Sequence, residues 1–203
     1  MQKIMFNDQY RLTEAVLEGR KTQTRKIIKC PREFKGEWVA GFNIHIRKSD
    51  KKVVDWPCMY DADEREFDGG EILPRYKVGE IVAIAQSYAD IGIEPFPFCE
   101  AGWRNKMRVK AELMPHQIKI TNVRIQRLQD ISDEDCLAEG IRKIESNKIS
   151  KAFGFDNSYE IPNQFPVFDS PREAYAALID KVSGKGTWES NPWVFVYEFE
   201  LVK

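Results

Sequence analysis

Alternating apolar and polar residues dominate this sequence and predict strands more often than helices. The alternation is longest near the end of the chain, over 193–202, and it also marks 104–112 and 117–128, while the short apolar run 81–85 predicts a buried strand. Helical periodicity is confined to a few short stretches. We therefore expect a single α+β domain that spans 1–203 and is built mainly from a β-sheet.

Three short helices are predicted between the strands. The first carries Leu12, Ala15 and Val16 as its buried stripe and ends at Gly19. The other two begin at Ser132 and Ser170, each of which opens a capping pattern. Apolar side chains recur along the last helix with the spacing of a face that packs on the core: Tyr175, Leu178, Ile179 and Val182.

The strand over 117–128 changes parity part-way along its length. Ile118 and Ile120 face one way, whereas Val123 and Ile125 face the other. Both pairs can reach one core only if an extra residue interrupts the strand, so we expect a bulge or bend near Thr121. Because such bends occur where a sheet curls, we expect a β-barrel with a few short peripheral helices.

The segment 30–73 looks like an insertion into this domain. Strand periodicity over 37–47, a turn at Ser49 and a return over 52–60 predict a hairpin. The acidic stretch 61–71 that follows is expected to be an exposed loop.

Composition narrows the class of protein. The chain has 203 residues, 42% of them hydrophobic, and a formal net charge of −1. That hydrophobic content excludes general disorder, and the near-zero charge leaves any binding to nucleic acid or membrane to local patches. With no long apolar run and no signal-peptide core at its start, the chain is expected to be soluble and cytoplasmic.

Potential metal ligands are few and scattered. The cysteines lie far apart and form no C-x-x-C pair, and only two histidines accompany them: Cys30, Cys58, Cys99, Cys136, His45 and His116. We therefore expect reduced, mostly structural thiols, no metal site and no cofactor.

The turn after the first helix carries a candidate catalytic pair. Lys21 and Thr24 stand three positions apart, and a tight turn can bring such side chains to the same side. Threonine becomes a nucleophile when a neighbour takes its proton, and a desolvated lysine can do so. The alternative is that these residues are solvated ones that follow a helix end.

Glu139 is a second candidate, because it occupies the end of the predicted helix 133–139, just before Gly140. The negative end of the helix dipole makes a carboxylate unfavourable there by about 0.3–1 kcal/mol. A cationic partner or a functional role would explain its position. Arg142 and Lys143 are the nearest cations in sequence and are candidates for a purely structural pairing.

Four motifs in register resemble ASCH-domain proteins, in the longer form common in bacteria and phages. They are Gly19-x-Lys21-x-x-Thr24, Tyr76-x-Val78-Gly79-Glu80, the run from Ile118 to Glu139-Gly140, and Asn191-Pro192-Trp193 with the strand after it. The resemblance implies a small β-barrel related to the PUA fold. It leaves two segments uncovered, about 30–73 and 142–168.

The resemblance extends to a shorter bacterial relative, an N(4)-acetylcytidine amidohydrolase that uses a lysine, a threonine and a glutamate. These fall on Lys21, Thr24 and Glu139, which implies that Thr24 attacks the acyl amide, Lys21 moves the proton and Glu139 orients the amine or water. The family often has an arginine at the position of Lys26, whereas the arginine of this chain, Arg25, stands one place earlier. Arg25 and Lys26 are therefore both candidate ligand-binding residues. Burial would make Lys21 a neutral base, whereas pairing with Glu139 would keep it a charged clamp.

A non-catalytic RNA-binding module is the alternative. In the predicted strand 104–112, four basic residues alternate and would form a stripe on one face: Arg104, Lys106, Arg108 and Lys110. Aromatic residues in the second uncovered segment would stack on bases, cover the site or pin their loop to the core: Phe153, Phe155, Tyr159, Phe165 and Phe168. The expected partner is thus a modified nucleoside or RNA, and a regulatory protein-interaction module is a third class.

Overall fold

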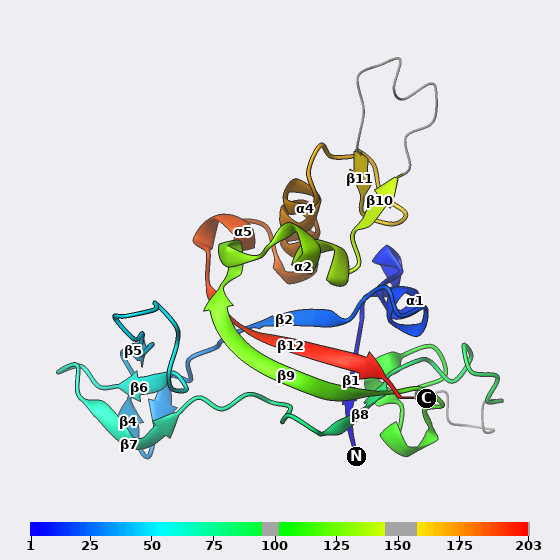
Figure 1. Cartoon of the computed structure of the whole chain (residues 1–203). Helices are drawn as coiled ribbons and strands as arrows, with labels where there is room; N and C mark the ends of the chain where they lie inside the picture. Colours follow the sequence, from blue (N-terminus) through cyan, green and yellow to red (C-terminus); the bar gives the residue numbers. More distant parts are fainter. Residues whose placement is uncertain (95–101, 145–157, 203) are drawn as a thin grey trace.

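A curved five-stranded sheet forms the centre of the molecule (Figure 1). The computed structural model describes residues 1–94, 102–144 and 158–202. The strands follow the spatial order β1 (Gln2–Ile4), β8 (Ile81–Ile84), β9 (Gln117–Arg127), β12 (Trp193–Leu201) and β2 (Gln23–Ile27). β1 runs parallel to β8, and the other neighbours are antiparallel. The α+β class expected from the sequence is confirmed.

The bulge expected in β9 is present. Along β12, Glu198 lies opposite Asn122 and Phe199 lies opposite Ile120, so Thr121 has no partner in that register. The extra residue keeps Ile118 and Ile120 in the core and still lets Val123 and Ile125 pack against it. The described strands leave β1 and β2 unpaired with each other, so closure into a barrel remains a prediction.

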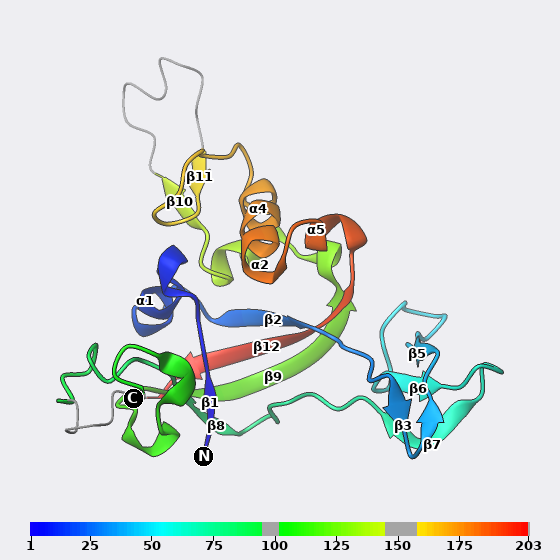
Figure 2. The ribbon, with the colours of Figure 1, turned by 180° about the vertical axis from the view of Figure 1, so that it is seen from behind.

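The helices gather on one side of the ribbon made by β9, β12 and β2, as both views show (Figures 1 and 2). They are α2 (Asp133–Ala138), α4 (Pro171–Ser183) and α5 (Thr187–Ser190), while α1 (Leu12–Leu17) precedes β2. Ser132 and Ser170 accept hydrogen bonds from backbone amides of α2 and α4, which confirms both caps. The stripe of α4 is buried except at Val182, which is 44% exposed.

Segment 30–73 forms two small sheets beside the main one, in cyan and teal in Figure 2. One pairs β3 (Glu33–Phe34) with β4 (Glu37–Trp38), and the other joins β5 (Gly41–Asn43), β6 (Cys58–Tyr60) and β7 (Glu66–Glu71). The predicted hairpin is confirmed by the β5–β6 pairing and by the bridge between Ile46 and Val53. The exposed loop predicted over 61–71 is present over 61–65, but the prediction is wrong over 66–71, where β7 pairs with the free edge of β6 and so satisfies its backbone groups.

The strand predicted over 104–112 is also wrong. This segment forms two 3₁₀ turns, η2 (Lys106–Arg108) and η3 (Ala111–Leu113). The side chain of Asn105 accepts a hydrogen bond from the Met107 amide and starts the first turn. A 3₁₀ turn does not alternate its side chains, so the basic stripe expected there has no strand to carry it.

The second uncovered segment is described only at its ends. β10 (Arg142–Ile144) pairs with β11 (Ser158–Glu160), and β11 is bridged through Tyr159 to Phe168. Tyr159 and Phe168 pack against the core, so these two aromatics pin their loop to it, whereas Phe165 is 91% exposed. Phe153 and Phe155 lie outside the described residues.

Candidate functional site

The turn after α1 places Lys21 beside the end of α2. Gly19 has a φ of 72°, the left-handed conformation in which glycine ends a helix without strain. The amide of Lys21 then bonds to the Ala15 carbonyl at 2.8 Å, and that of Thr22 bonds to the Ala138 carbonyl at 2.9 Å. The chain is thereby tied to both helices, and the Lys21 side chain is directed to Glu139.

Lys21, Arg25 and Glu139 form a buried ion cluster. Lys21 Nζ lies 2.5 Å from Glu139 Oε2 and donates a second bond, of 2.8 Å, to the Glu139 carbonyl oxygen. Arg25 Nη1 donates to the other carboxylate oxygen, Oε1, at 2.9 Å. The three side chains are at most 5% exposed. One carboxylate thus compensates two buried cations.

The position of Glu139 at a helix end is explained by these cations. Glu139 caps the end of α2, where the helix dipole disfavours a carboxylate. Lys21 reaches it from the turn before β2, and Arg25 reaches it from β2. The pairing expected with Arg142 is wrong, because that arginine lies 3.5 Å from Glu160. Gly140 has a φ of 107°, which other residues rarely adopt, and a Cβ there would lie 3.0 Å from Leu12 Cδ2.

Asp135 supports the cluster from one helical turn earlier. Its Oδ2 accepts from Arg25 Nη2 and from Arg124 Nη2, both at 2.6 Å, and its Oδ1 accepts from Gln23 Nε2 at 2.9 Å. Neither Asp135 nor Arg124 was predicted from the sequence to be a site residue. The i, i+4 spacing of Asp135 and Glu139 places them on one face of α2 and is the signal that points to this pair.

Thr24 lies next to this cluster without joining it. It is a buried residue of β2, opposite Tyr197, and successive strand residues point to opposite faces. Among the described residues, its hydroxyl makes no hydrogen bond with Lys21, whose Nζ is bound to Glu139 instead. The hydrogen bond that the Lys21–Thr24 spacing suggested is therefore absent among the described residues, although both side chains line the same cavity.

A cavity of about 400 Å³ joins these residues. Lys21, Thr24, Arg25 and Glu139 all line it, together with exposed Lys26. Its walls come from the segment after β1, from β2 and from α4. The cavity is therefore lined by residues of one edge strand of the sheet, β2, and by residues that directly follow the other, β1. Ligand cavities commonly have volumes of roughly 300–1,000 Å³. The space is sufficient for a nucleoside base with a small acyl group.

Burial controls the protonation of the cluster. Desolvation lowers the pKa of Lys21, and the Glu139 carboxylate only partly opposes it. Desolvation is the largest effect, and the positive charges of Lys26 and Arg25 lower the pKa of Lys21 further. Burial raises the pKa of Tyr175 well above its usual value, so its phenol is neutral.

Two buried polar atoms beside the cavity have no hydrogen-bond partner among the described residues. They are the Tyr175 hydroxyl and Arg25 Nε, and both residues line the cavity. The guanidinium carbon of Arg25 lies 5.9 Å from the centre of the Tyr175 ring. Buried donors are ordinarily satisfied, so these two are candidates to bind an acceptor on a ligand.

The other basic residues named from the sequence lie away from this cavity. Lys106 is held by Asp8 and by the Thr13 hydroxyl, and Arg104 rests on the Trp103 ring. Arg108 and Lys110 are exposed. These four do not form a continuous extension of the cluster around Lys21.

The cysteines in the described residues are Cys30, Cys58 and Cys136, and all three are free. Burial raises the pKa of Cys136 to about 12, which leaves an inert thiol. Across residues 1–94, 102–144 and 158–202, His, Cys, Asp and Glu side chains form no group of three or more placed to hold a metal ion. In the same part of the chain, no helix has the length and apolar character needed to cross a membrane.

Comparisons with protein-family models, with curated proteins and with solved structures found no match to this chain.

Proposed function

We propose that this protein is a PUA-like ASCH-domain enzyme that binds a nucleoside or RNA base and hydrolyses an N(4)-acylcytidine amide. The observation that carries the proposal is the convergence of Lys21, Thr24 and Glu139 on one cavity of about 400 Å³. Lys21 and Glu139 are separated by more than half of the chain, yet their charged groups are 2.5 Å apart. The curved sheet with its bulge in β9 supports the proposed fold.

In this mechanism the Thr24 hydroxyl oxygen attacks the acyl carbonyl carbon, and neutral Lys21 takes the hydroxyl proton. The tetrahedral intermediate collapses when its C–N bond breaks, and Lys21 returns the proton to the departing amine of cytidine. Water then attacks the threonine ester, Lys21 takes a proton from it, and the C–O bond to Thr24 breaks with that proton returned to the hydroxyl. The products are the free carboxylic acid and cytidine.

The electrostatics of the cluster favour Lys21 as the base. Its lowered pKa increases the fraction of neutral amine, and Arg25 stays paired with Glu139 when Lys21 turns away. Lys21 must leave Glu139 and turn toward Thr24, since no hydrogen bond joins them in the described structure. Glu139 would then orient the amine or the attacking water.

Deacetylation of N(4)-acetylcytidine tests this function. Cytidine release by the wild type is compared with release by Thr24→Ala, with Thr24→Ser as the matched control that keeps a hydroxyl. Loss of the nucleophile should lower kcat by about 10³-fold or more, and serine should retain a substantial part of it. Equal turnover by the wild type and Thr24→Ala would exclude Thr24 as the nucleophile.

Binding of a base without catalysis is a second candidate, favoured by the short contact between Lys21 and Glu139. If this ion pair persists, Lys21 acts as a charged clamp for a carbonyl or phosphate oxygen. Cytidine binding measured by calorimetry, without turnover of the acetylated form, would select this function. Lys21→Met should then weaken binding, whereas Thr24→Ala should leave it nearly unchanged.

A further inference from the structure

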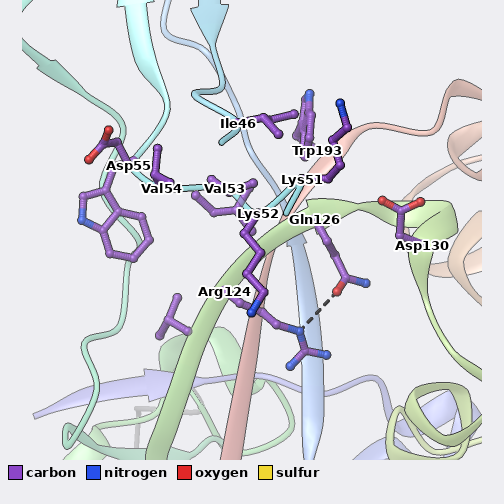
Figure 3. Close-up of a pocket in the computed structure, with 13 residues that line it drawn as sticks. Ile46, Lys51, Lys52, Val53, Val54, Asp55, Arg124, Gln126, Asp130 and Trp193 are labelled. Carbon is purple, nitrogen blue, oxygen red and sulfur yellow. Dashed lines mark hydrogen bonds between the residues drawn. The ribbon is translucent and has the colours of Figure 1, made fainter. Parts of the chain in front are cut away.

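A larger cavity, of about 740 Å³, lies between the first insertion and the sheet (Figure 3). The hairpin loop of the insertion forms one wall, and the end of β9 with Trp193 forms the other. Beyond Ile120, whose backbone bonds to Gly79 and Glu80, no described strand pairs with β9 on the side of β8, so the end of β9 that lines this cavity is a free edge. The resemblance that suggests the Lys21 site does not cover the insertion, so this cavity is independent of it.

Cations lie on both walls of this cavity. Lys51 and Lys52 are exposed, and their amines make no hydrogen bond or ion pair with other described residues. Figure 3 shows Lys52 reaching across the cavity toward Arg124 on β9. Two carboxylates also line the cavity, those of Asp55 and Asp130, and Asp55 lies 3.9 Å from a nitrogen of His45.

Arg124 is fixed in place by its own partners. Its guanidinium binds Asp135 and Glu198, and its Nε donates to Gln126 Oε1 at 3.2 Å. The two lysines are therefore the cations that remain available to an anion. A phosphate near them would gain charge-assisted hydrogen bonds that solvated lysines lack.

The walls also offer a surface for a flat aromatic ring. Trp193 lies against the Arg127 guanidinium, 4.4 Å from its ring centre, which orients the indole at the cavity. Trp56 also lines the cavity and packs edge-on against Phe195. Aliphatic side chains from the hairpin, including Val53, face the same space. Base–aromatic stacking contributes about 1–3 kcal/mol per base in nucleic-acid complexes.

A polar group capable of recognising a base is also present. Gln126 Nε2 is buried and has no hydrogen-bond partner among the described residues. Because Gln126 Oε1 accepts from Arg124, the amide is held with its donor side free. This donor matches a ring nitrogen or carbonyl oxygen of a base.

We propose that this second cavity binds a nucleotide. The base stacks on Trp193 and accepts a hydrogen bond from Gln126, while the phosphate binds the Lys52 amine, which Figure 3 shows inside the cavity. A free nucleotide and one unit of a single-stranded RNA present the same chemistry. The site does not depend on catalysis in the Lys21 cavity.

The register of the sheet sets the distance between Arg25, which lines the first cavity, and Arg124, which lines the second. Val196 of β12 lies opposite Arg25 on one side and Arg124 on the other. Two strand spacings separate these arginines, which amounts to about 10 Å. Both arginines bind Asp135, so one carboxylate connects the two cavities.

Binding of cytidine monophosphate by calorimetry, and of a short unstructured RNA by fluorescence anisotropy, tests this site. Lys52→Gln is compared with Lys48→Gln, which removes an exposed lysine from the same hairpin outside the cavity. We expect Lys52→Gln to weaken binding about tenfold, as the loss of one charge-assisted contact does. Lys48→Gln should leave affinity within about twofold of the wild type.

The two probes distinguish the sources of the nucleotide. Tight RNA binding that cytidine monophosphate does not displace assigns the site to RNA, and displacement by the mononucleotide assigns it to free nucleotides as well. Repeating the titrations with Lys21→Met separates this site from the Lys21 cavity, because that variant should weaken binding in the Lys21 cavity and leave the Lys52-dependent binding in place. Absence of binding to both probes, or equal loss in Lys48→Gln and Lys52→Gln, would overturn the proposal.

Discussion

The two cavities use charge in opposite ways. In the Lys21 cavity the cations are buried and already compensated by Glu139 and Asp135. In the cavity beside the insertion, Lys51 and Lys52 are exposed and unpaired among the described residues. A buried, compensated lysine has an altered pKa and is suited to proton transfer, whereas a solvated one is suited to attracting an anion. This difference is the basis for proposing chemistry in the first cavity and binding in the second.

Removal of the Glu139 carboxylate should produce the largest change. Glu139→Leu leaves Lys21 and Arg25 buried with one carboxylate fewer, and we expect the free energy of unfolding to fall by about 3–5 kcal/mol. Urea unfolding measures the change. Lys52→Gln, which alters an exposed cation, is the control and should change stability by no more than about 0.5 kcal/mol. Comparable losses in the two variants would contradict the contrast between the cavities.

Asp135→Asn should have the next largest effect, since Asp135 accepts from both Arg25 and Arg124. We expect a loss of about 1–3 kcal/mol in the free energy of unfolding, because hydrogen bonds to a charged acceptor are replaced by weaker ones. The affinity of the second cavity for cytidine monophosphate should also fall, as Arg124 loses its orientation. An unchanged affinity would show that the shared carboxylate does not connect the cavities.

The pH dependence of stability should reveal the buried lysine. The folded chain holds Lys21 with a pKa below the usual 10.5, so between the two values the unfolded chain binds a proton that the folded chain lacks. The free energy of unfolding should therefore rise with pH in that window, by at most about 1.4 kcal/mol per pH unit. Lys21→Met should remove this rise. The same rise in the variant would assign it to other groups.

If Lys21 is the base, kcat/KM for N(4)-acetylcytidine should also increase with pH, with a midpoint below 10.5. The increase reflects loss of the Lys21 proton in the free enzyme. A profile that falls as Lys21 deprotonates would favour the charged clamp.

The smallest expected stability effect is at Tyr175, whose buried hydroxyl has no partner among the described residues. Tyr175→Phe should leave the free energy of unfolding unchanged or raise it by about 1 kcal/mol, because an unsatisfied polar group is removed. A loss of cytidine affinity or of kcat in this variant would show that a ligand bonds to the hydroxyl. A clear loss of stability would show that the hydroxyl has a partner in the free protein.

Local signals in the sequence predicted much of the sheet. The parity change in 117–128 located the bulge at Thr121, and the serine caps located α2 and α4. These features depend on neighbouring residues, which a sequence displays directly. The predictions for 66–71 and 104–112 were wrong for different reasons. The acidic, glycine-containing stretch 66–71 has no alternating pattern, yet it pairs with the neighbouring strand β6. In 104–112, Lys106 is held by Asp8 and Thr13, which are distant in sequence.

The candidate site was predictable to a similar extent. The unfavourable position of Glu139 at a helix end showed that it needs a cation, and Lys21 provides one. The sequence did not reveal that Arg25 shares that carboxylate or that Asp135 joins Arg25 to Arg124. Those contacts depend on the register between β2, β12 and β9, and spacing along the chain does not encode register.

The account is tested most directly by following cytidine release from N(4)-acetylcytidine with the wild type, Thr24→Ala and Lys52→Gln under identical conditions. We expect cytidine from the wild type and from Lys52→Gln at similar rates, and none above background from Thr24→Ala. That result would place the chemistry in the Lys21 cavity and keep it separate from the nucleotide site. Absence of cytidine from the wild type, or its release at equal rates by Thr24→Ala, would contradict the central claim.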